Sequence, residues 1–167
     1  IQKKSHKDFF KNFLSFFKNK DRRVSYILTG SINFWWTLTY VFIPLLIISK
    51  GFDEHVVGYF LFFVAVPLIL FEYYFSKLAG RVGFKKVFQA GFLLTFIISL
   101  ICFFTSNIYF ILSLVAFASI GIAMLEPTNV AYFFDITKKK DVNRFYSPYN
   151  TSLVLFGFFG KLLSSLI

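Results

Sequence analysis

Between two long apolar runs, residues 76–86 read Ser-Lys-Leu-Ala-Gly-Arg-Val-Gly-Phe-Lys-Lys. A tight loop between two membrane helices needs glycine where the backbone turns, and Gly80 and Gly83 are placed for that role. Such a loop also needs cationic side chains where it meets cytosol and lipid phosphate. The stretch supplies them in Lys77, Arg81, Lys85 and Lys86. We therefore expect a short cytoplasmic loop that joins two membrane spans.

The composition of the chain is typical of a membrane protein. Of its 167 residues, 57% are hydrophobic and 16% are charged, which excludes a disordered chain and an ordinary soluble domain. Five apolar runs approach the ~20 residues that cross about 30 Å of hydrocarbon. The expected fold class is therefore all-α, a polytopic transmembrane helix bundle over residues 24–167. Its five expected spans are residues 24–49, 56–74, 87–104, 108–125 and 149–167.

Positive charge is distributed unevenly along the chain. Sixteen of the 18 Lys and Arg residues lie in residues 1–23, 77–86 and 135–148. Five alternating spans place these three segments on one side, and the cytoplasmic side carries the excess of Lys and Arg. We expect an integral protein of the plasma (inner) membrane with a cytoplasmic N-terminal segment. Because sidedness accounts for the net charge of +10, nucleic acid is not an expected partner.

Residues 1–23 form a separate basic segment. Apolar residues recur in it at helical spacing, with Lys, Asn and Ser between them. This pattern predicts an amphipathic helix that lies on an anionic membrane face, with lipid as its partner. Its apolar positions are Phe9, Phe10, Phe13, Leu14, Phe16 and Phe17.

Residues 76–86 resemble the loop signature of the major facilitator superfamily, which runs Gly-x-Leu-Ala-Asp-Arg-x-Gly-Arg-Lys/Arg. Two positions depart from it: Ser76 replaces the first glycine, and Gly80 replaces an acidic residue that helps to close the cytoplasmic side in the family. The resemblance implies a secondary active transporter that moves a small solute by alternating access, coupled to an ion or a proton. The matching residues are Leu78, Ala79, Arg81, Gly83, Lys85 and Lys86.

The resemblance also implies a position within a twelve-helix fold. In the family the signature follows the second helix of a six-helix half, and here it follows the second expected span. The basic segment resembles the cytoplasmic linker between the halves. The chain begins with Ile1 rather than Met, and its last apolar run stops at Ile167. We therefore expect helices seven to eleven, with the N-terminal half of the same transporter missing. The alternative is helices one to five.

A polar stripe in the first span is the main candidate for a substrate cavity. Thr29, Asn33, Thr37 and Tyr40 recur every three or four residues and so share one face of a helix, with Asn33, Thr37 and Tyr40 as the candidate cavity residues. Pro44 further along could kink the helix. In lipid such a stripe must face protein or a water-filled cavity. We favour the cavity. The alternative is interhelical hydrogen bonding, commonly worth ~0.6 kcal/mol per contact.

Lys161 is a further candidate for the cavity. Counted from residue 149, it lies about 18 Å into a helix and close to the bilayer centre. A charge there costs at least about 2.5–3.5 kcal/mol. We expect Lys161 to bind an anionic group of the solute or to pair with a carboxylate of the missing half. The alternative is that the span begins earlier and Lys161 snorkels outward.

Two carboxylates are candidates for a gate or for ion coupling. We expect Glu72 near the cytoplasmic end of the second span and Glu126 near that of the fourth. Either could carry a coupling proton. We favour a salt bridge to Arg81 or Lys85 that closes the inner face, because both expected positions lie near the basic loop.

No enzyme or metal motif stands out. His6 and His55 lie far apart and Cys102 is the single cysteine, so we expect no metal site, no cofactor and no intrachain disulfide. Patterns for nucleophilic catalysis or phosphate binding are missing, so we do not expect an enzyme. Small residues such as Gly91, Thr95 and Gly121 predict helix packing. The alternative to a transporter is a non-transporting membrane scaffold or sensor.

Overall fold

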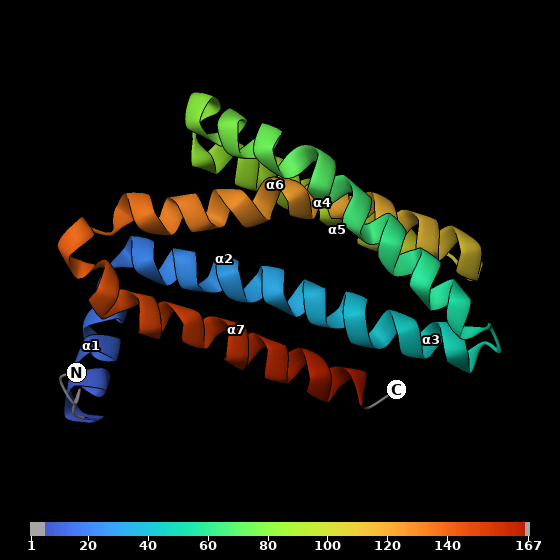
Figure 1. Cartoon of the computed structure of the whole chain (residues 1–167), viewed down its shortest axis with the longest axis horizontal. Helices are drawn as coiled ribbons and strands as arrows, with labels where there is room; N and C mark the ends of the chain where they lie inside the picture. Colours follow the sequence, from blue (N-terminus) through green and yellow to red (C-terminus); the bar gives the residue numbers. More distant parts are fainter. Residues whose placement is uncertain (1–5, 166–167) are drawn as a thin grey trace. The chain divides into compact units, whose positions relative to one another are not determined.

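A computed structural model describes residues 6–165 of the chain, with the side chains of residues 6–9 left aside. The first five residues of the basic segment and the last two of the fifth expected span lie outside it. The described part is helical and has no strand, which confirms the all-α fold. Its helices form two compact units (Figure 1). One unit extends to Trp35 and resumes at Asn129, and the other is Trp36–Thr128.

Four helical segments among the described residues are long and apolar enough to cross a membrane. The first, Lys20–Ser49, consists of α2 (Lys20–Thr37), the π-helical turn η1 (Leu38–Phe42) and α3 (Ile43–Ser49). The others are α4 (Glu54–Val82), α5 (Phe84–Phe103) and α6 (Ile108–Ile136). With 29 residues each, α4 and α6 are about 43 Å long. Both helices are longer than the expected spans 56–74 and 108–125, because a helix can continue beyond the end of an apolar run.

The helices begin and end at residues that supply specific backbone partners. Asn19, Asp53 and Asn107 precede α2, α4 and α6, and each side chain accepts a hydrogen bond from a backbone N–H two or three residues later, at 3.0–3.3 Å. Such caps satisfy N–H groups that have no partner within the helix. Gly51 and Gly83 have positive φ angles, 80° and 92°, and form the turns after α3 and α4.

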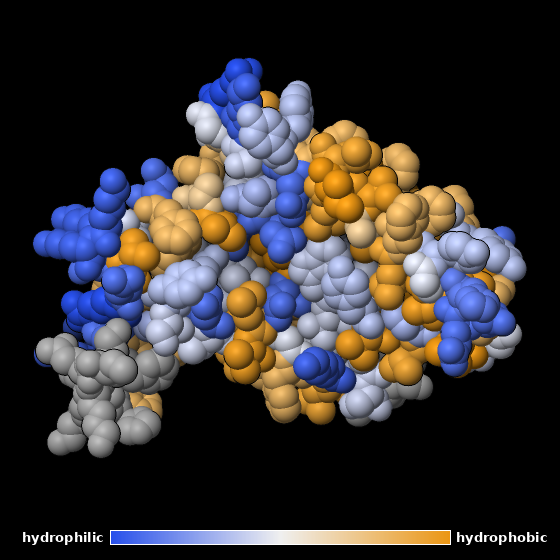
Figure 2. Space-filling view, in the orientation of Figure 1, coloured by the Kyte–Doolittle hydropathy of each residue, from blue (hydrophilic) through white to orange (hydrophobic). Residues whose placement is uncertain are grey.

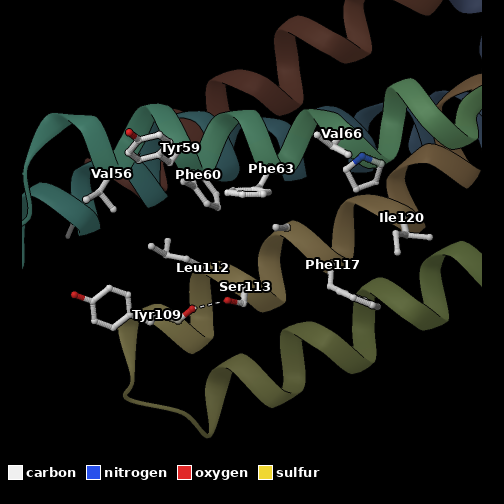
Figure 3. A pocket seen from close by; sticks show the side chains of 12 residues that line it. Val56, Tyr59, Phe60, Phe63, Val66, Tyr109, Leu112, Ser113, Phe117 and Ile120 are labelled. Carbon is white, nitrogen blue, oxygen red and sulfur yellow. Dashed lines mark hydrogen bonds between the residues drawn. The ribbon is translucent and has the colours of Figure 1, made fainter.

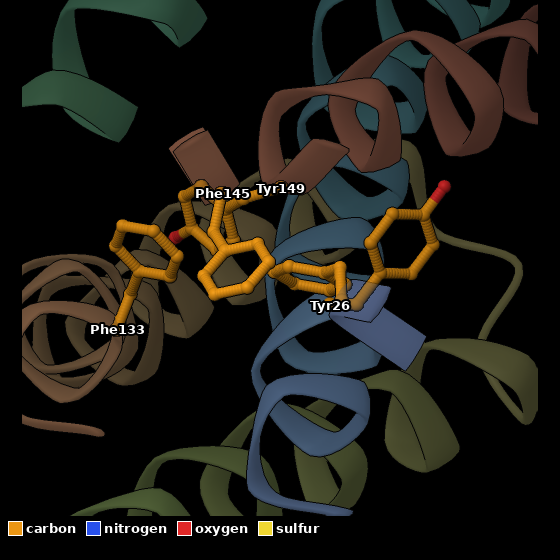
Figure 4. Packing of buried hydrophobic residues seen from close by; sticks show 5 residues of the cluster. Tyr26, Phe133, Phe145 and Tyr149 are labelled. Atoms are coloured by element: carbon orange, nitrogen blue, oxygen red, sulfur yellow. The ribbon is translucent and has the colours of Figure 1, made fainter. Parts of the chain in front are cut away.

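The first unit is built around an aromatic cluster. α1 (His6–Phe17) packs against α7 (Val142–Ser164), which follows the short 3-10 helix η2 (Lys139–Asp141). The rings of Phe133 and Tyr149 stack with centroids 4.1 Å apart. Part of the apolar face of α1 is therefore buried in protein, not in lipid. The cluster consists of Phe16, Tyr26, Phe133, Phe145 and Tyr149, four of which Figure 4 labels.

The second unit depends on a close approach of α5 and α6. A methyl group added at Gly91 would lie 2.8 Å from the side chain of Leu125, and one at Gly121 would lie 2.5 Å from Oγ1 of Thr95. Neither helix has room for a larger residue at this crossing. The packing face that small residues predict is confirmed here, and it follows the rule that membrane helices approach through small residues.

Much of the apolar surface faces outward. Figure 2 shows hydrophobic side chains over large areas and hydrophilic ones at its top, where Figure 1 places the turn between α4 and α5. Exposure of this extent would be unfavourable in water and suits helices surrounded by lipid. Examples among the more exposed side chains are Phe62, Ile69, Tyr73, Phe96 and Phe103.

Candidate functional site

The best-defined polar group in the second unit joins Trp36 to Glu126. The indole Nε1 of Trp36 donates a hydrogen bond to Oε2 of Glu126 at 3.2 Å. The ring of Tyr40, one turn further along, stacks on Trp36 with centroids 4.9 Å apart and planes 14° from parallel. Glu126 and Trp36 are both partly buried, and Tyr40 is half exposed. The arrangement is a carboxylate with one fixed donor beside a stacked aromatic pair.

A second carboxylate lies near the first. Glu72 on α4 is close enough to Glu126 for their charges to interact. Glu72 stands ten residues before Val82, the end of α4, and Glu126 stands ten residues before Ile136, the end of α6. Each carboxylate is thus about 15 Å from the end of its helix. Both helices continue well beyond the apolar runs, and the position of the two carboxylates near the cytoplasmic ends of their spans stays a prediction.

The salt bridges expected for these carboxylates are not formed. Within the part of the chain that the structure describes, the one ion pair within 4.0 Å joins His55 to Asp53. Glu126 is paired with Trp36 instead of Arg81 or Lys85. A carboxylate within a membrane helix that has no cationic partner is a feature of sites that bind a proton or a substrate.

The backbone around Tyr40 is irregular. Leu38–Phe42 forms a π-helical turn, and Pro44 follows at the start of α3. Proline has no N–H to donate within a helix, so it disturbs the regular ladder. π-helical turns are rare and frequently lie at functional sites. Sequence reasoning singled out Tyr40 and Pro44, but it missed Trp36, whose place beside Glu126 depends on two helices far apart in the sequence.

The residues of the expected polar stripe have different surroundings. Asn33 donates through Nδ2 to the backbone oxygen of Leu153 on α7, an interhelical hydrogen bond of the kind held as the alternative. Thr37 is buried in the second unit. Of the three candidate residues, Tyr40 is the one that contacts the Trp36–Glu126 pair.

A buried polar network in the first unit was not expected. Nδ2 of Asn129 donates to Oγ1 of Thr29 at 2.6 Å and to the hydroxyl of Tyr149 at 3.1 Å. Oγ1 of Thr29 in turn donates to the backbone oxygen of Ser25 at 2.9 Å. All four residues are buried. Of these residues, sequence reasoning singled out Thr29, as part of the polar stripe in the first span. It did not single out Asn129 or Tyr149, which lie in other helices. The network joins α2, α6 and α7.

The signature stretch forms a turn of one residue. α4 continues to Val82 and α5 begins at Phe84, so Gly83 alone forms the turn. Gly80 is helical, and the expectation that the backbone turns there is wrong. A methyl group added at Gly80 would meet nothing within 4 Å. Arg81, Lys85 and Lys86 are exposed, Leu78 is partly buried, and the neighbouring Ala79 is buried.

Lys161 lies further from the start of its helix than expected. α7 begins at Val142, seven residues before the expected start, and Lys161 stands in its last turn. That is about 28 Å from the first residue of α7 instead of 18 Å. The side chain is exposed. Pro148 is accommodated inside the helix and does not mark its beginning, and the mid-bilayer position of Lys161 stays a prediction.

An apolar groove of about 520 Å³ lies between α4 and α6 (Figure 3). Its walls include Tyr59, Phe63, Tyr109 and Phe117. The hydroxyl of Ser113 donates to the backbone oxygen of Tyr109 at 2.8 Å, so it is already used within α6. None of the residues singled out by sequence reasoning lines this groove. Among the described residues, no group of three His, Cys, Asp or Glu side chains could hold a metal ion.

The family model described as the Major Facilitator Superfamily matches residues 26–167, which includes all four apolar spans apart from the first turns of α2. The searches of curated proteins and of solved structures found no match.

Proposed function

The chain belongs to the Major Facilitator Superfamily, and from this we propose that it moves a small solute across the plasma (inner) membrane by alternating access, coupled to protons. Proteins of this family are transporters that sit in lipid and bind small solutes. Its apolar helices identify the chain as an integral membrane protein. We place the chain as helices seven to eleven, with α1 as the cytoplasmic linker from the missing N-terminal half. The support is the one-residue turn after the second span and the basic charge of α1.

The observation that carries the proposal is the Trp36–Glu126 pair. Glu126 lies about 15 Å from the end of α6, has an indole donor at 3.2 Å and has no cationic partner among the described side chains. An ionised carboxylate in such a place is expensive, and it is retained mainly where it binds a proton or a substrate. We assign the proton to Glu126 and contact with the solute to Trp36 and Tyr40.

The location of this group also fits alternating access. Substrate and coupling sites of secondary transporters lie near the bilayer midplane, at interrupted helices. The π-helical turn at Leu38–Phe42 interrupts the first span, and α6 carries Pro127 directly after Glu126. Tyr40 lies in the π-helical turn, Trp36 lies two residues before that turn, and Glu126 directly precedes a proline within α6.

The test is proton flux in liposomes that contain the whole transporter, with its N-terminal half, and a trapped pH-sensitive dye. Sugars, amino acids, organic anions and organic cations are added in turn. We expect one class to drive proton flux, Glu126→Gln to abolish that flux, and Glu54→Gln to retain it, because Glu54 is an exposed carboxylate in the first turn of α4. Unchanged flux in Glu126→Gln would refute the assignment of the proton. If no class drives flux, the scaffold or sensor interpretation is favoured.

A further inference from the structure

A cationic groove lies where α1 meets α7 in the first unit. It has a volume of about 520 Å³. Five of its lining residues come from α1 and the residue after it, and one comes from α7. They are Lys11, Leu14, Ser15, Phe17, Lys18 and Arg144.

The groove has three positive charges, on Lys11, Lys18 and Arg144. Among the described side chains, none of the three cations forms an ion pair with a carboxylate. Nε of Arg144 donates to Oδ1 of Asn12 at 2.6 Å, and its guanidinium carbon lies 5.1 Å from the centre of the Phe145 ring. A guanidinium has five N–H donors, and this bond uses one. Arg144 is thus held in position with most of its donors uncommitted by any hydrogen bond to a described residue.

We propose that this groove binds the phosphate of one anionic phospholipid headgroup. Lys11, Lys18 and Arg144 provide the positive charge for the phosphate, and Leu14 with Phe17 provides an apolar wall for the glycerol and upper acyl chain. Charge complementarity of this kind is the basis of headgroup recognition at membrane surfaces. The site does not involve Glu126 and is independent of the proposed transport mechanism.

The apolar surface of α1 favours a lipid over a free phosphate. Phe10 and Leu14 are 66% and 67% exposed and lie four residues apart, on one face of the helix. Leu14 also lines the groove, so the exposed apolar face and the cationic groove are continuous. Water disfavours such a face, whereas acyl chains cover it. A free phosphate would satisfy the cations and leave these two side chains uncovered.

The docking of α1 gives the groove a fixed shape. Nε and Nη2 of Arg22 donate to the backbone oxygens of Phe16 and Ser15 at 3.2 and 3.1 Å. The Arg22 guanidinium also lies 4.0 Å from the centre of the Phe145 ring. These contacts hold the C-terminal end of α1 beside α7, so Lys11 and Lys18 stay close to Arg144. The lipid would therefore meet a preformed site.

The experiment measures lipid retained by the purified protein. The protein is placed in nanodiscs of phosphatidylcholine that contain a small fraction of phosphatidylglycerol, and bound lipid is counted by native mass spectrometry after release. Lys11→Gln/Lys18→Gln is compared with Lys139→Gln/Lys140→Gln, which removes two exposed lysines outside the groove. At about fivefold per charge, we expect about 25-fold weaker retention of phosphatidylglycerol in the first variant and near wild-type retention in the second.

Each other outcome would overturn the proposal. Equal loss in the two variants would mean a general effect of surface charge. Equal retention would mean that the groove binds no lipid. Displacement of phosphatidylglycerol by millimolar inorganic phosphate, with the same dependence on Lys11 and Lys18, would identify a free phosphate as the ligand. Because the substituted lysines are exposed, matching melting temperatures are expected to show that both variants are folded.

Discussion

The indole nitrogen of Trp36 donates to Oε2 of Glu126 across 3.2 Å, although the two residues lie 90 positions apart in the sequence. A hydrogen bond to a charged group contributes about 1.5–3 kcal/mol, so this contact fixes α2 against α6 near Thr37. It also makes Trp36 a reporter for the protonation of the carboxylate.

The fluorescence of Trp36 should depend on pH through Glu126. Trp35→Phe leaves Trp36 as the single tryptophan and removes a buried indole N–H that has no hydrogen-bond partner, so we expect it to fold normally. In that background the emission of Trp36 should follow one titration, because protonation changes the acceptor that faces the indole. The measurement is a fluorescence titration in detergent.

The matched controls for this titration are two glutamate variants. Glu126→Gln should remove the pH dependence, and Glu54→Gln should keep it, since Glu54 is exposed at the start of α4. A titration that survives in Glu126→Gln would assign the proton to another group, with Glu72 as the next to replace.

Replacing Gly121 by alanine should loosen the α5–α6 crossing. The added methyl group would meet Thr95 and the backbone oxygen of Gly91 at 2.5 and 2.9 Å, and overpacking of this kind costs about 1–3 kcal/mol. Thermal unfolding in detergent measures it. Gly58→Ala, with nothing within 4 Å of the new methyl group, should be neutral or slightly stabilising. Equal melting temperatures for the two variants would show that the helices can separate without loss.

Gly80 and Gly83 should respond in opposite directions to alanine. Gly80 is helical with open space beside it, so Gly80→Ala should stabilise the protein by about 0.5–1 kcal/mol. Gly83 has φ 92° and ψ 144°, a region that costs other residues about 1–3 kcal/mol, so Gly83→Ala should destabilise it. Chemical unfolding of the two variants measures the change in the free energy of unfolding. Destabilisation by Gly80→Ala would contradict the helical assignment.

Loss of Arg22 should release α1 from the bundle. Arg22→Gln removes the contacts to Phe16, Ser15 and Phe145, and we expect hydrogen exchange in α1 to rise about tenfold, the equivalent of about 1.4 kcal/mol. Arg23→Gln is the control, because Arg23 is exposed. Faster exchange in both variants alike would show that net charge, not these contacts, holds α1.

Hydropathy predicted the helical class and four of the five expected membrane-length helices, and the loop signature at residues 76–86 predicted the family. Each depends on residues close together in the sequence. The ends of α4 and α6 and the start of α7 were predicted less well, because a helix can continue beyond its apolar run. α4 continues through polar Ser76 and Lys77, and α7 begins before Pro148. Helix ends are set by capping groups and glycine, and these operate independently of hydropathy.

The pairing of Trp36 with Glu126 was beyond sequence reasoning for a different reason. Tyr40, Glu72 and Glu126 were each named as candidates, but nothing local shows which faces of two helices meet. Trp36 was absent from the candidates because an aromatic residue in a membrane span needs no special explanation. The contact became visible only once the register of α2 against α6 was known.

The single-residue turn at Gly83 also limits insertions and deletions at this point of the chain. An added residue would have no loop to absorb it, so α5 would turn by about 100° about its axis and carry Gly91 away from Gly121. A deletion would turn it the other way. Substitutions of the exposed cations around the turn leave that register intact, so natural variants of this region should differ in their side chains. Insertions and deletions should be confined to longer connections such as residues 50–53 and 137–141.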